Sequence, residues 1–148
     1  KITAEYIRKW QDAGYKDIPA SDLVALKSQD ITPEFLSSFA SAGHPKVSVH
    51  KALPLKAMNI TPEYINSFKE AGYDNVSLDA AIGLKSQEIT PAVVKEYNDL
   101  GFGKVDLQEI VAAKATNTTP RYIKSMMDKG HHLKSLQKYI TLKTVTSD

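Results

Sequence analysis

The 148-residue sequence contains no cysteine, which excludes disulfide bonds, thiol nucleophiles and cysteine metal ligands together. It has no run of 18 or more apolar residues, so it predicts no membrane-spanning helix. The first residues, Lys1 to Glu5, include neither an initiating Met nor the apolar stretch of a signal peptide, as expected of a mature or trimmed fragment. With 42% hydrophobic and 24% charged residues, the composition is typical of a globular domain.

The chain also has little net charge, +2, which is too small to indicate a polyanion as partner. The charge is unevenly distributed, because residues 118–146 carry six basic side chains and one acid, whereas residues 60–88 carry two basic side chains and five acids. These segments have net charges of +5 and −3. No continuous basic track results, which argues against nucleic acid as the main partner.

A repeat of 29 residues organises the whole chain. Its most visible mark is the pair Thr-Pro, found at Thr32-Pro33, Thr61-Pro62, Thr90-Pro91 and Thr119-Pro120, with Thr3-Ala4 one step earlier. The sequence therefore divides into five repeats, residues 2–30, 31–59, 60–88, 89–117 and 118–146. A glycine and a lysine recur in every repeat, at Gly14, Gly43, Gly72, Gly101 and Gly130, and at Lys27, Lys56, Lys85, Lys114 and Lys143.

Each repeat predicts a first helix of about ten residues. The threonine is an N-cap whose hydroxyl accepts from an unpaired backbone N–H, and the proline fits the first helical position, where no N–H is needed. The glycine ends this helix in a left-handed conformation, and in a Schellman motif the next residue contacts the residue four before the glycine. The predicted contact pairs are Trp10–Tyr15, Phe39–His44, Phe68–Tyr73, Tyr97–Phe102 and Met126–His131.

A second helix follows in each repeat, capped by Ser48, Ser77, Asp106 or Ser135 in the last four. Pro19 and Ser21 suggest that the second helix of the first repeat begins two or three residues later than in the others. We expect Pro54 to shorten or kink the second helix of the second repeat, and the segment from Thr141 to Thr146 to fray.

The predicted fold is all-α, a single domain over residues 1–148. One helical pair of this length cannot bury its apolar face alone, whereas stacking similar pairs at a constant period buries a continuous core. We therefore expect the five helix-turn-helix repeats to stack as an α-solenoid or a compact superhelical array.

The recurring lysines, Lys27, Lys56, Lys85, Lys114 and Lys143, have two interpretations. A residue displayed once per repeat along a solenoid can form a binding stripe for a partner. Alternatively, each lysine lies near the C-terminus of its second helix, where a cation favours the helix dipole and its methylene stem covers apolar surface. The structural interpretation is the stronger, but both remain open.

The sequence offers no pattern for metal binding, cofactor binding or catalysis. His131 and His132 are adjacent and badly placed to share a metal, His44 and His131 occupy the aromatic position after the glycine, and no H-E-x-x-H spacing includes His50. No nucleophile motif or glycine-rich phosphate loop is present. We therefore predict no metal, no cofactor, no catalytic residues and no enzymatic activity.

What varies between the repeats is the outer face of the first helix. In repeat proteins such variable faces usually recognise a protein or peptide partner. Together with the lysines, the candidate partner-binding residues are Arg8, Lys9 and Asp12 in the first repeat, Ser37, Ser38 and Ser41 in the second, and Asn66, Ser67 and Glu70 in the third.

The spelling of the third repeat resembles that of a known repeat family. Ile60-Thr61-Pro62-Glu63-Tyr64-Ile65, followed by Ala71-Gly72-Tyr73, Val76-Ser77 and Leu84-Lys85, is similar to repeats found in C-terminal, extracytoplasmic extensions of BlaR1-type (M56) peptidase-like sensors of bacteria. The likeness extends through all five repeats, but the zinc motif and membrane helices of those sensors are absent from this sequence. The resemblance implies a non-catalytic sensor or interaction appendage in the bacterial envelope, with membrane attachment only through another part of the protein.

The leading functional hypothesis is a non-catalytic helical-repeat interaction or regulatory module in a larger envelope or signalling protein. Its expected location is extracytoplasmic, with a cytoplasmic location still open. An alternative is electrostatic binding of anionic lipid or nucleic acid by the basic fifth repeat. A third hypothesis, a hydrolase assembled between repeats, requires a polar cleft with convergent ionisable groups.

Overall fold

The computed structural model describes residues 1–146, and within them the chain is all-α, with no strand. The ten α-helices and two 3₁₀-helices, in chain order, are α1 (Ala4–Asp12), α2 (Ala20–Ser28), α3 (Pro33–Ser37), η1 (Ser38–Ala42), α4 (Val49–Ala57), α5 (Pro62–Ser67), η2 (Phe68–Ala71), α6 (Leu78–Ser86), α7 (Pro91–Asn98), α8 (Leu107–Ala115), α9 (Pro120–Asp128) and α10 (Leu136–Val145). The predicted fold class is confirmed at this level. None of the described helices is long and apolar enough to cross a membrane.

The Thr-Pro pairs start helices as predicted. The side chains that accept a hydrogen bond from the backbone N–H three residues later, at 3.0–3.3 Å, are those of Thr3, Thr61, Thr90 and Thr119. Thr32 precedes α3 in the same extended conformation but makes no side-chain capping bond. A second set of caps is also confirmed, because Ser48, Asp106 and Ser135 accept from backbone N–H groups of α4, α8 and α10.

The glycine after each first helix has a positive φ, and in four repeats it closes the predicted motif. In the first repeat Gly14 has φ +94°, the Tyr15 N–H donates to the Trp10 carbonyl at 2.9 Å, and the two rings meet edge-on 5.4 Å apart. The backbone N–H groups of His44, Tyr73 and His131 make the same return bond.

In the fourth repeat the predicted Schellman motif is wrong. Within residues 1–146 the Phe102 N–H does not donate to the Tyr97 carbonyl, and the Phe102 ring lies 5.8 Å from that of Tyr139. A second left-handed glycine, Gly103 (φ +82°), redirects this loop.

The second helices end in a left-handed residue that is not glycine, a stop signal that the sequence analysis did not identify. These residues are Asp30, Asn59, Glu88 and Asn117, with φ between 54° and 59°. In each case the next N–H returns to a carbonyl five residues earlier, as in Ile60 to Leu55 at 2.9 Å. Asn and Asp tolerate this region better than other non-glycine residues, so Glu88 carries the least suitable side chain of the four.

Two expectations about the second helices are wrong: Pro54 does not shorten α4, and α2 does not begin late. Pro54 lies inside α4, yet α4 has nine residues, the same length as α2, α6 and α8. The Pro54 carbonyl still accepts from the Met58 N–H at 2.9 Å, and Ala52 and Leu55 are fully buried, so packing on both sides of the proline outweighs its missing N–H. The start of α2 is also not delayed, because Pro19 occupies its N-cap with the extended ψ of 148° that this position requires.

Two other segments differ in detail from the expected helices. The first helices of the second and third repeats are not single α-helices of ten residues, since α3 and α5 tighten into η1 and η2, a common way to finish a helix. At the other end of the chain α10 is helical through Val145, over most of the segment expected to fray.

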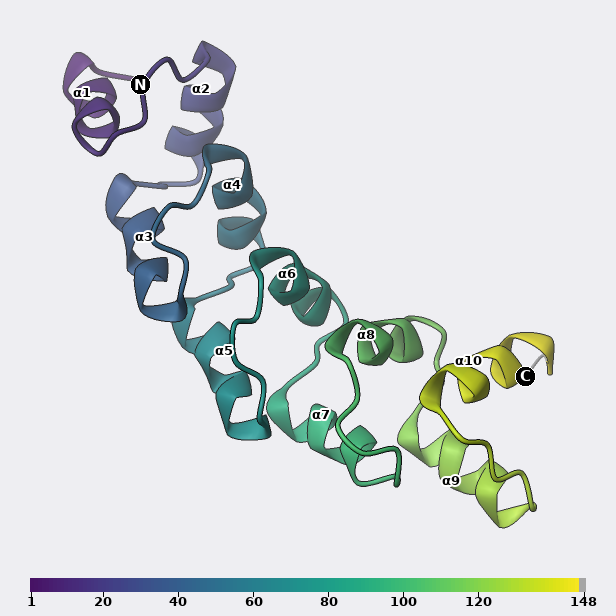
Figure 1. Cartoon of the computed structure of the whole chain (residues 1–148). Coiled ribbons are helices and arrows are strands. Elements are labelled where there is room, and N and C mark those ends of the chain that lie inside the picture. Colours follow the sequence, from purple (N-terminus) through teal and green to yellow (C-terminus); the bar gives the residue numbers. More distant parts are fainter. Residues whose placement is uncertain (147–148) are drawn as a thin grey trace. The chain divides into compact units, whose positions relative to one another are not determined.

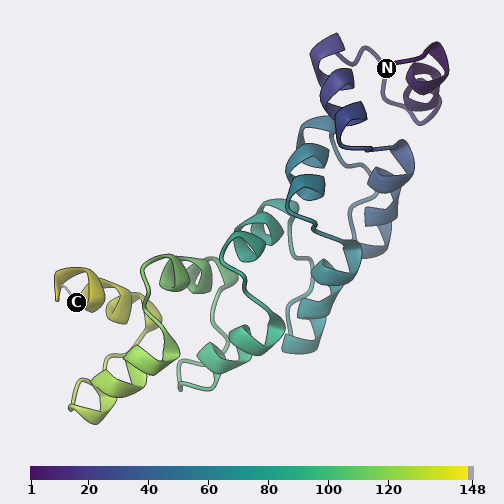
Figure 2. The same ribbon diagram turned by 180° about the vertical axis from the view of Figure 1, so that it is seen from behind.

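The chain forms two compact parts. The N-terminal part comprises residues 1–66 and 74–78, and the C-terminal part comprises residues 67–73 and the described chain from 79 onward, so the division passes through the third repeat. In the N-terminal part α2 packs against α4, and Leu26 of α2 and Leu55 of α4 are fully buried (Figures 1 and 2). In the C-terminal part α8 packs against α7 and α10, with Tyr97 and Tyr139 fully buried.

Candidate functional site

The candidate residues of the first repeat lie on α1 and are all exposed. Arg8 and Asp12 lie on the side of the helix opposite the buried Tyr6 and Trp10, and Lys9 lies at the edge of the buried face. None of the three forms an ion pair within residues 1–146. Two cations and one acid are therefore available to a partner at this position.

The three serines of the second repeat are exposed but partly committed to their own helix. The hydroxyl groups of Ser37, Ser38 and Ser41 donate to the backbone carbonyls three residues earlier, at 3.1, 2.6 and 3.0 Å. Each hydroxyl oxygen remains able to accept a hydrogen bond. This surface is therefore neutral and offers acceptors in preference to donors.

The candidates of the third repeat have different surroundings. Within the N-terminal part, the Asn66 amide nitrogen donates to the Ser41 carbonyl at 3.2 Å, which brings candidates of two repeats together. The Asn66 Oδ1 atom is buried without a partner. Ser67 is half-buried, and Glu70 is exposed on η2 in the C-terminal part.

Glu70 borders a hollow in the C-terminal part, between η2 and α7. Its volume is about 460 Å³, and its other lining residues are Ala71, Pro91, Ala92, Lys95, Asn98 and Asp99. Lys95 and Asp99 are paired across one helical turn with a nitrogen–oxygen distance of 3.3 Å, whereas Glu70 has no partner among the described residues. The hollow thus combines small apolar side chains with one unpaired carboxylate.

Asn98 holds the inner wall of this hollow in place. Its Oδ1 accepts from the Val105 N–H at 2.8 Å, and its Nδ2 donates to the Tyr73 hydroxyl at 3.2 Å. The Tyr73 hydroxyl in turn donates to the Val105 carbonyl. Because both ends of the amide are engaged, these contacts fix the orientation of Asn98 in the wall of the hollow.

Three of the recurring lysines lie over aromatic rings within their own repeats. The Nζ atoms of Lys27, Lys56 and Lys143 lie 5.0, 5.3 and 4.8 Å from the ring centroids of Tyr6, Phe35 and Tyr122. The aromatic residue always precedes the lysine by 21 residues, a spacing that was visible in the sequence but not used. The residue 21 positions before Lys114 is Val93, which has no ring, and Lys85 and Lys114 are both half-buried.

The sequence indicates two structural roles for these lysines, a favourable charge at the helix C-terminus and a methylene stem that covers apolar surface. The contacts with aromatic rings add a third. A cation over an aromatic face at an exposed site contributes roughly 0.5–1 kcal/mol. A lysine engaged in this way still exposes part of its ammonium group, so the contacts do not decide between a structural and a binding role.

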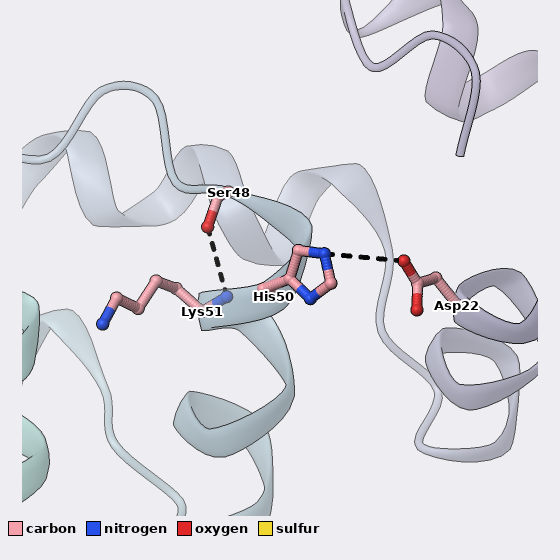
Figure 3. A network of polar contacts seen from close by, with 4 residues as sticks. All are labelled: Asp22, Ser48, His50 and Lys51. Atoms are coloured by element: carbon pink, nitrogen blue, oxygen red, sulfur yellow. Dashed lines mark hydrogen bonds and ion pairs between the residues drawn. The ribbon is translucent and has the colours of Figure 1, made fainter. Parts of the chain in front are cut away.

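The histidines are spread over separate contacts. The His44 Nε2 atom lies 2.9 Å from the Val76 carbonyl and donates to it. The His50 ring projects from α4 toward Asp22 of α2, with 3.8 Å between Nε2 and Oδ2, while Ser48 caps the same helix through the Lys51 N–H (Figure 3). The His50 side chain is 82% exposed, so this is a weak surface contact.

The arrangement and the pKa shifts of the ionisable side chains within residues 1–146 bear on metal binding and on the activation of catalytic groups. No three side chains of the His, Cys, Asp or Glu type come together to hold a metal ion. The resolved pKa shifts all belong to tyrosines, and burial raises the pKa of Tyr64 and of Tyr97 to about 12. A raised pKa keeps these phenols protonated, the opposite of what an activated nucleophile requires.

A recurring hydrogen bond between neighbouring repeats was not predicted. The residue after the first-helix glycine donates to the backbone carbonyl 32 residues later, from Tyr15 to Val47 at 2.6 Å, from His44 to Val76, and from Tyr73 to Val105. We call these three contacts the inter-repeat latches. In the sequence, the only sign of these contacts is that the aromatic residue after the glycine carries a hydrogen-bond donor on its ring. The acceptor is a backbone carbonyl, which any residue can supply, so the sequence does not identify it.

Comparison of the chain with protein-family models, with curated proteins and with solved structures found no match in any of the three.

Proposed function

We propose that the chain is a non-catalytic interaction module in which five helix-turn-helix repeats stack as an α-solenoid or a compact superhelical array. The support is the regular spacing of the second helices along the chain. Each begins 29 residues after the one before it, in the order α2, α4, α6, α8 and α10. The second helices of successive repeats pack together in each compact part, α2 with α4 and α8 with α10. The inter-repeat latches add a polar contact at the same phase.

The observation that carries an interaction function is the hollow beside Glu70. It lies on the first-helix side, where the repeats differ from one another, and it is lined by Ala71, Pro91 and Ala92 with charged residues at its rim. A concave apolar surface with a few placed polar groups is the usual form of a binding site. No group of ionisable side chains in it supports catalysis.

The chemistry of the hollow favours a protein segment as the ligand. Its small apolar side chains leave room for an apolar side chain of the partner, and the unpaired Glu70 carboxylate accepts hydrogen bonds from a lysine or arginine. Lys95 is already paired with Asp99, so it adds little attraction for an acidic ligand. The preferred partner is therefore a peptide or loop that combines an apolar and a basic residue.

Selection from a random peptide library displayed against the purified chain tests this proposal. We expect enriched peptides to carry a basic residue next to an apolar one, and Glu70→Lys to weaken their binding roughly tenfold. Glu96→Lys is the matched control, since Glu96 is exposed on α7 but does not line the hollow. No enrichment, or equal losses for the two variants, would contradict the proposal.

The resemblance of residues 60–65 to repeats of bacterial sensor proteins supports a place for the module in a larger envelope or signalling protein. A regulatory, extracytoplasmic role is the form of the proposal that this resemblance favours. The full-length gene product tests it directly. A membrane span or a peptidase-like domain encoded with these repeats would support it, and a gene encoding only cytoplasmic enzyme domains around them would contradict it.

A second candidate function is electrostatic binding by the fifth repeat. Five of its basic side chains are exposed and without an ion pair in the described chain, namely Arg121, Lys124, Lys129, Lys134 and Lys138. Such a surface attracts anionic lipid by about 1 kcal/mol per basic residue near the headgroups. Salt-sensitive binding to vesicles containing phosphatidylserine, absent for phosphatidylcholine vesicles, would support this candidate, and equal affinities would exclude it.

A further inference from the structure

The first repeat exposes apolar positions that are covered in the later repeats. Ile7 is half-buried, whereas Leu36, Ile65, Val94 and Ile123, at the same position of the other repeats, are 0–2% exposed. Ile18 is half-buried, whereas Val47, Val76 and Val105 are buried. Val24 is 58% exposed, whereas Leu53, Ile82, Val111 and Ile140 are not exposed.

Contacts within the C-terminal part explain what covers this last position. A Cβ atom built on Gly83 of α6 would lie 3.7 Å from both terminal carbons of Val111 on α8. Val111 therefore packs against the second helix of the preceding repeat. Val24 occupies the equivalent place, so its exposed side chain marks the surface on which a preceding repeat would pack.

The fifth repeat has the complementary set of uncovered groups. Met126 and Leu142 are half-buried, whereas the residues at their positions in the other four repeats are 0% exposed. His131 stands at the position of the latch donors Tyr15, His44 and Tyr73, yet it is exposed and its ring has no hydrogen-bond partner within residues 1–146. Likewise, no donor reaches the Ile18 carbonyl, which stands at the position of the latch acceptors.

We propose that the chain associates head to tail with a second copy of itself, the fifth repeat of one copy packing on the first repeat of the next. In this register His131 Nε2 donates to the Ile18 carbonyl of the second copy, as His44 donates to Val76. The inference rests on the stacked-repeat arrangement proposed above, but it concerns a different surface from the hollow beside Glu70.

The loop of the first repeat has the backbone conformation that accepts a histidine. Asp17 has φ 58°, and so does Asn75, which precedes the Val76 carbonyl to which His44 donates. The loops that accept a tyrosine carry a lysine at this position instead: Lys46 lies 4.2 Å from the Tyr15 centroid and Lys104 lies 4.7 Å from that of Tyr73. The first repeat therefore matches the histidine type of latch.

Charge also favours this pairing. The fifth repeat has a net charge of +5, and the first repeat, with four basic and five acidic residues, has −1. Asp17 would place a carboxylate beside the His131 imidazole, where the internal tyrosine latches have a lysine over the ring. A head-to-tail contact of this kind uses two different surfaces, so it extends by addition of further copies and does not close as a symmetric dimer.

Sedimentation velocity of the 148-residue chain over micromolar to millimolar concentrations tests the proposal. We expect the weight-average mass to rise with concentration above the 16.3 kDa of the monomer. Val24→Glu blocks the first-repeat surface and His131→Asp places a carboxylate against Asp17, so each variant alone is expected to associate at least roughly fivefold more weakly. Both substitutions are at exposed positions, and circular dichroism verifies that the variants remain folded.

Mixing the two variants decides the geometry. Val24→Glu retains an intact fifth repeat and His131→Asp an intact first repeat, so the mixture should form a heterodimer that grows no further. Ser28→Glu is the matched control, because the equivalent position is exposed in all five repeats and the variant should associate like the wild type. A wild-type chain that stays monomeric, or a mixture that does not recover association, would overturn the proposal without affecting peptide binding at the hollow.

Discussion

The Tyr97 hydroxyl offers the sharpest test of the packing. Tyr97 is fully buried, and its hydroxyl donates to the carbonyl of Thr118, also fully buried, at 2.8 Å. Tyr97→Phe removes the donor, so the buried Thr118 carbonyl loses this hydrogen bond and has no water to replace it. The substitution therefore loses the net free energy of the hydrogen bond and adds part of the desolvation penalty of the carbonyl. We expect the free energy of unfolding to fall by about 2 kcal/mol.

Urea denaturation followed by circular dichroism measures this change. For a slope of about 2 kcal/mol per molar urea, the midpoint of Tyr97→Phe should fall by roughly 1 M. The matched control is Tyr122→Phe, since the Tyr122 hydroxyl makes only an exposed 3.5 Å contact with Thr146, and we expect a shift near zero. Equal shifts for the two variants would refute the role assigned to the buried hydrogen bond.

The pH dependence of the stability difference between the wild type and Tyr97→Phe provides a second check. Burial, with a smaller contribution from the Glu96 charge, raises the pKa of Tyr97 to about 12, above the ordinary tyrosine value of 10.0. The native state therefore keeps a proton that the unfolded chain releases, so the stabilising contribution is complete below pH 10 and is lost as the pH rises toward 12. The stability difference between the wild type and Tyr97→Phe should shrink over this range, and a constant difference would contradict the assigned pKa.

The remaining predictions concern helix ends. Glu88→Asn should raise the free energy of unfolding by about 0.5–1 kcal/mol in urea titrations, because asparagine tolerates the φ of 54° better than glutamate, and a loss of stability would contradict this reasoning. Thr119→Ala should cost about 1 kcal/mol, whereas Thr32→Ala should cost much less because its side chain makes no cap bond. Gly43→Ala should lower the thermal midpoint through its φ of +90° alone, since no atom lies within 4 Å of the added carbon.

The parts of the fold that depend on local chemistry were predictable. Thr119 with Pro120 and the glycine after each first helix determine where helices begin and end through their own backbone preferences. The non-glycine stops were missed because a residue such as Glu88 adopts the left-handed region only when the surrounding Schellman bonds and a buried isoleucine hold it there. The tolerance of Pro54 likewise depends on packing against neighbouring helices, which no local preference describes.

For the candidate site, only the helix face on which it lies was predictable from the sequence. Variation between repeats identified Glu70 as an outer position, but not the hollow beside it, which depends on η2 and α7 coming together from successive repeats. The inter-repeat latches were missed for the same reason, since their acceptors are backbone carbonyls 32 residues away. The donor and the acceptor of each latch belong to successive repeats, so the contact is recognised only when equivalent positions of neighbouring repeats are compared in the structure.

Both proposals depend on stacking of equivalent repeats, and deletion of one whole repeat tests that claim most directly. Removing residues 60–88 brings Val105 to the place of Val76, so His44 regains a backbone carbonyl at the latch position, now in the loop that carries Lys104. The shortened chain should keep its ellipticity per residue and unfold cooperatively. Removing residues 62–86 instead breaks the phase and should abolish cooperative unfolding. Loss of helical structure on the in-phase deletion, or equal behaviour of the two deletions, would contradict the account.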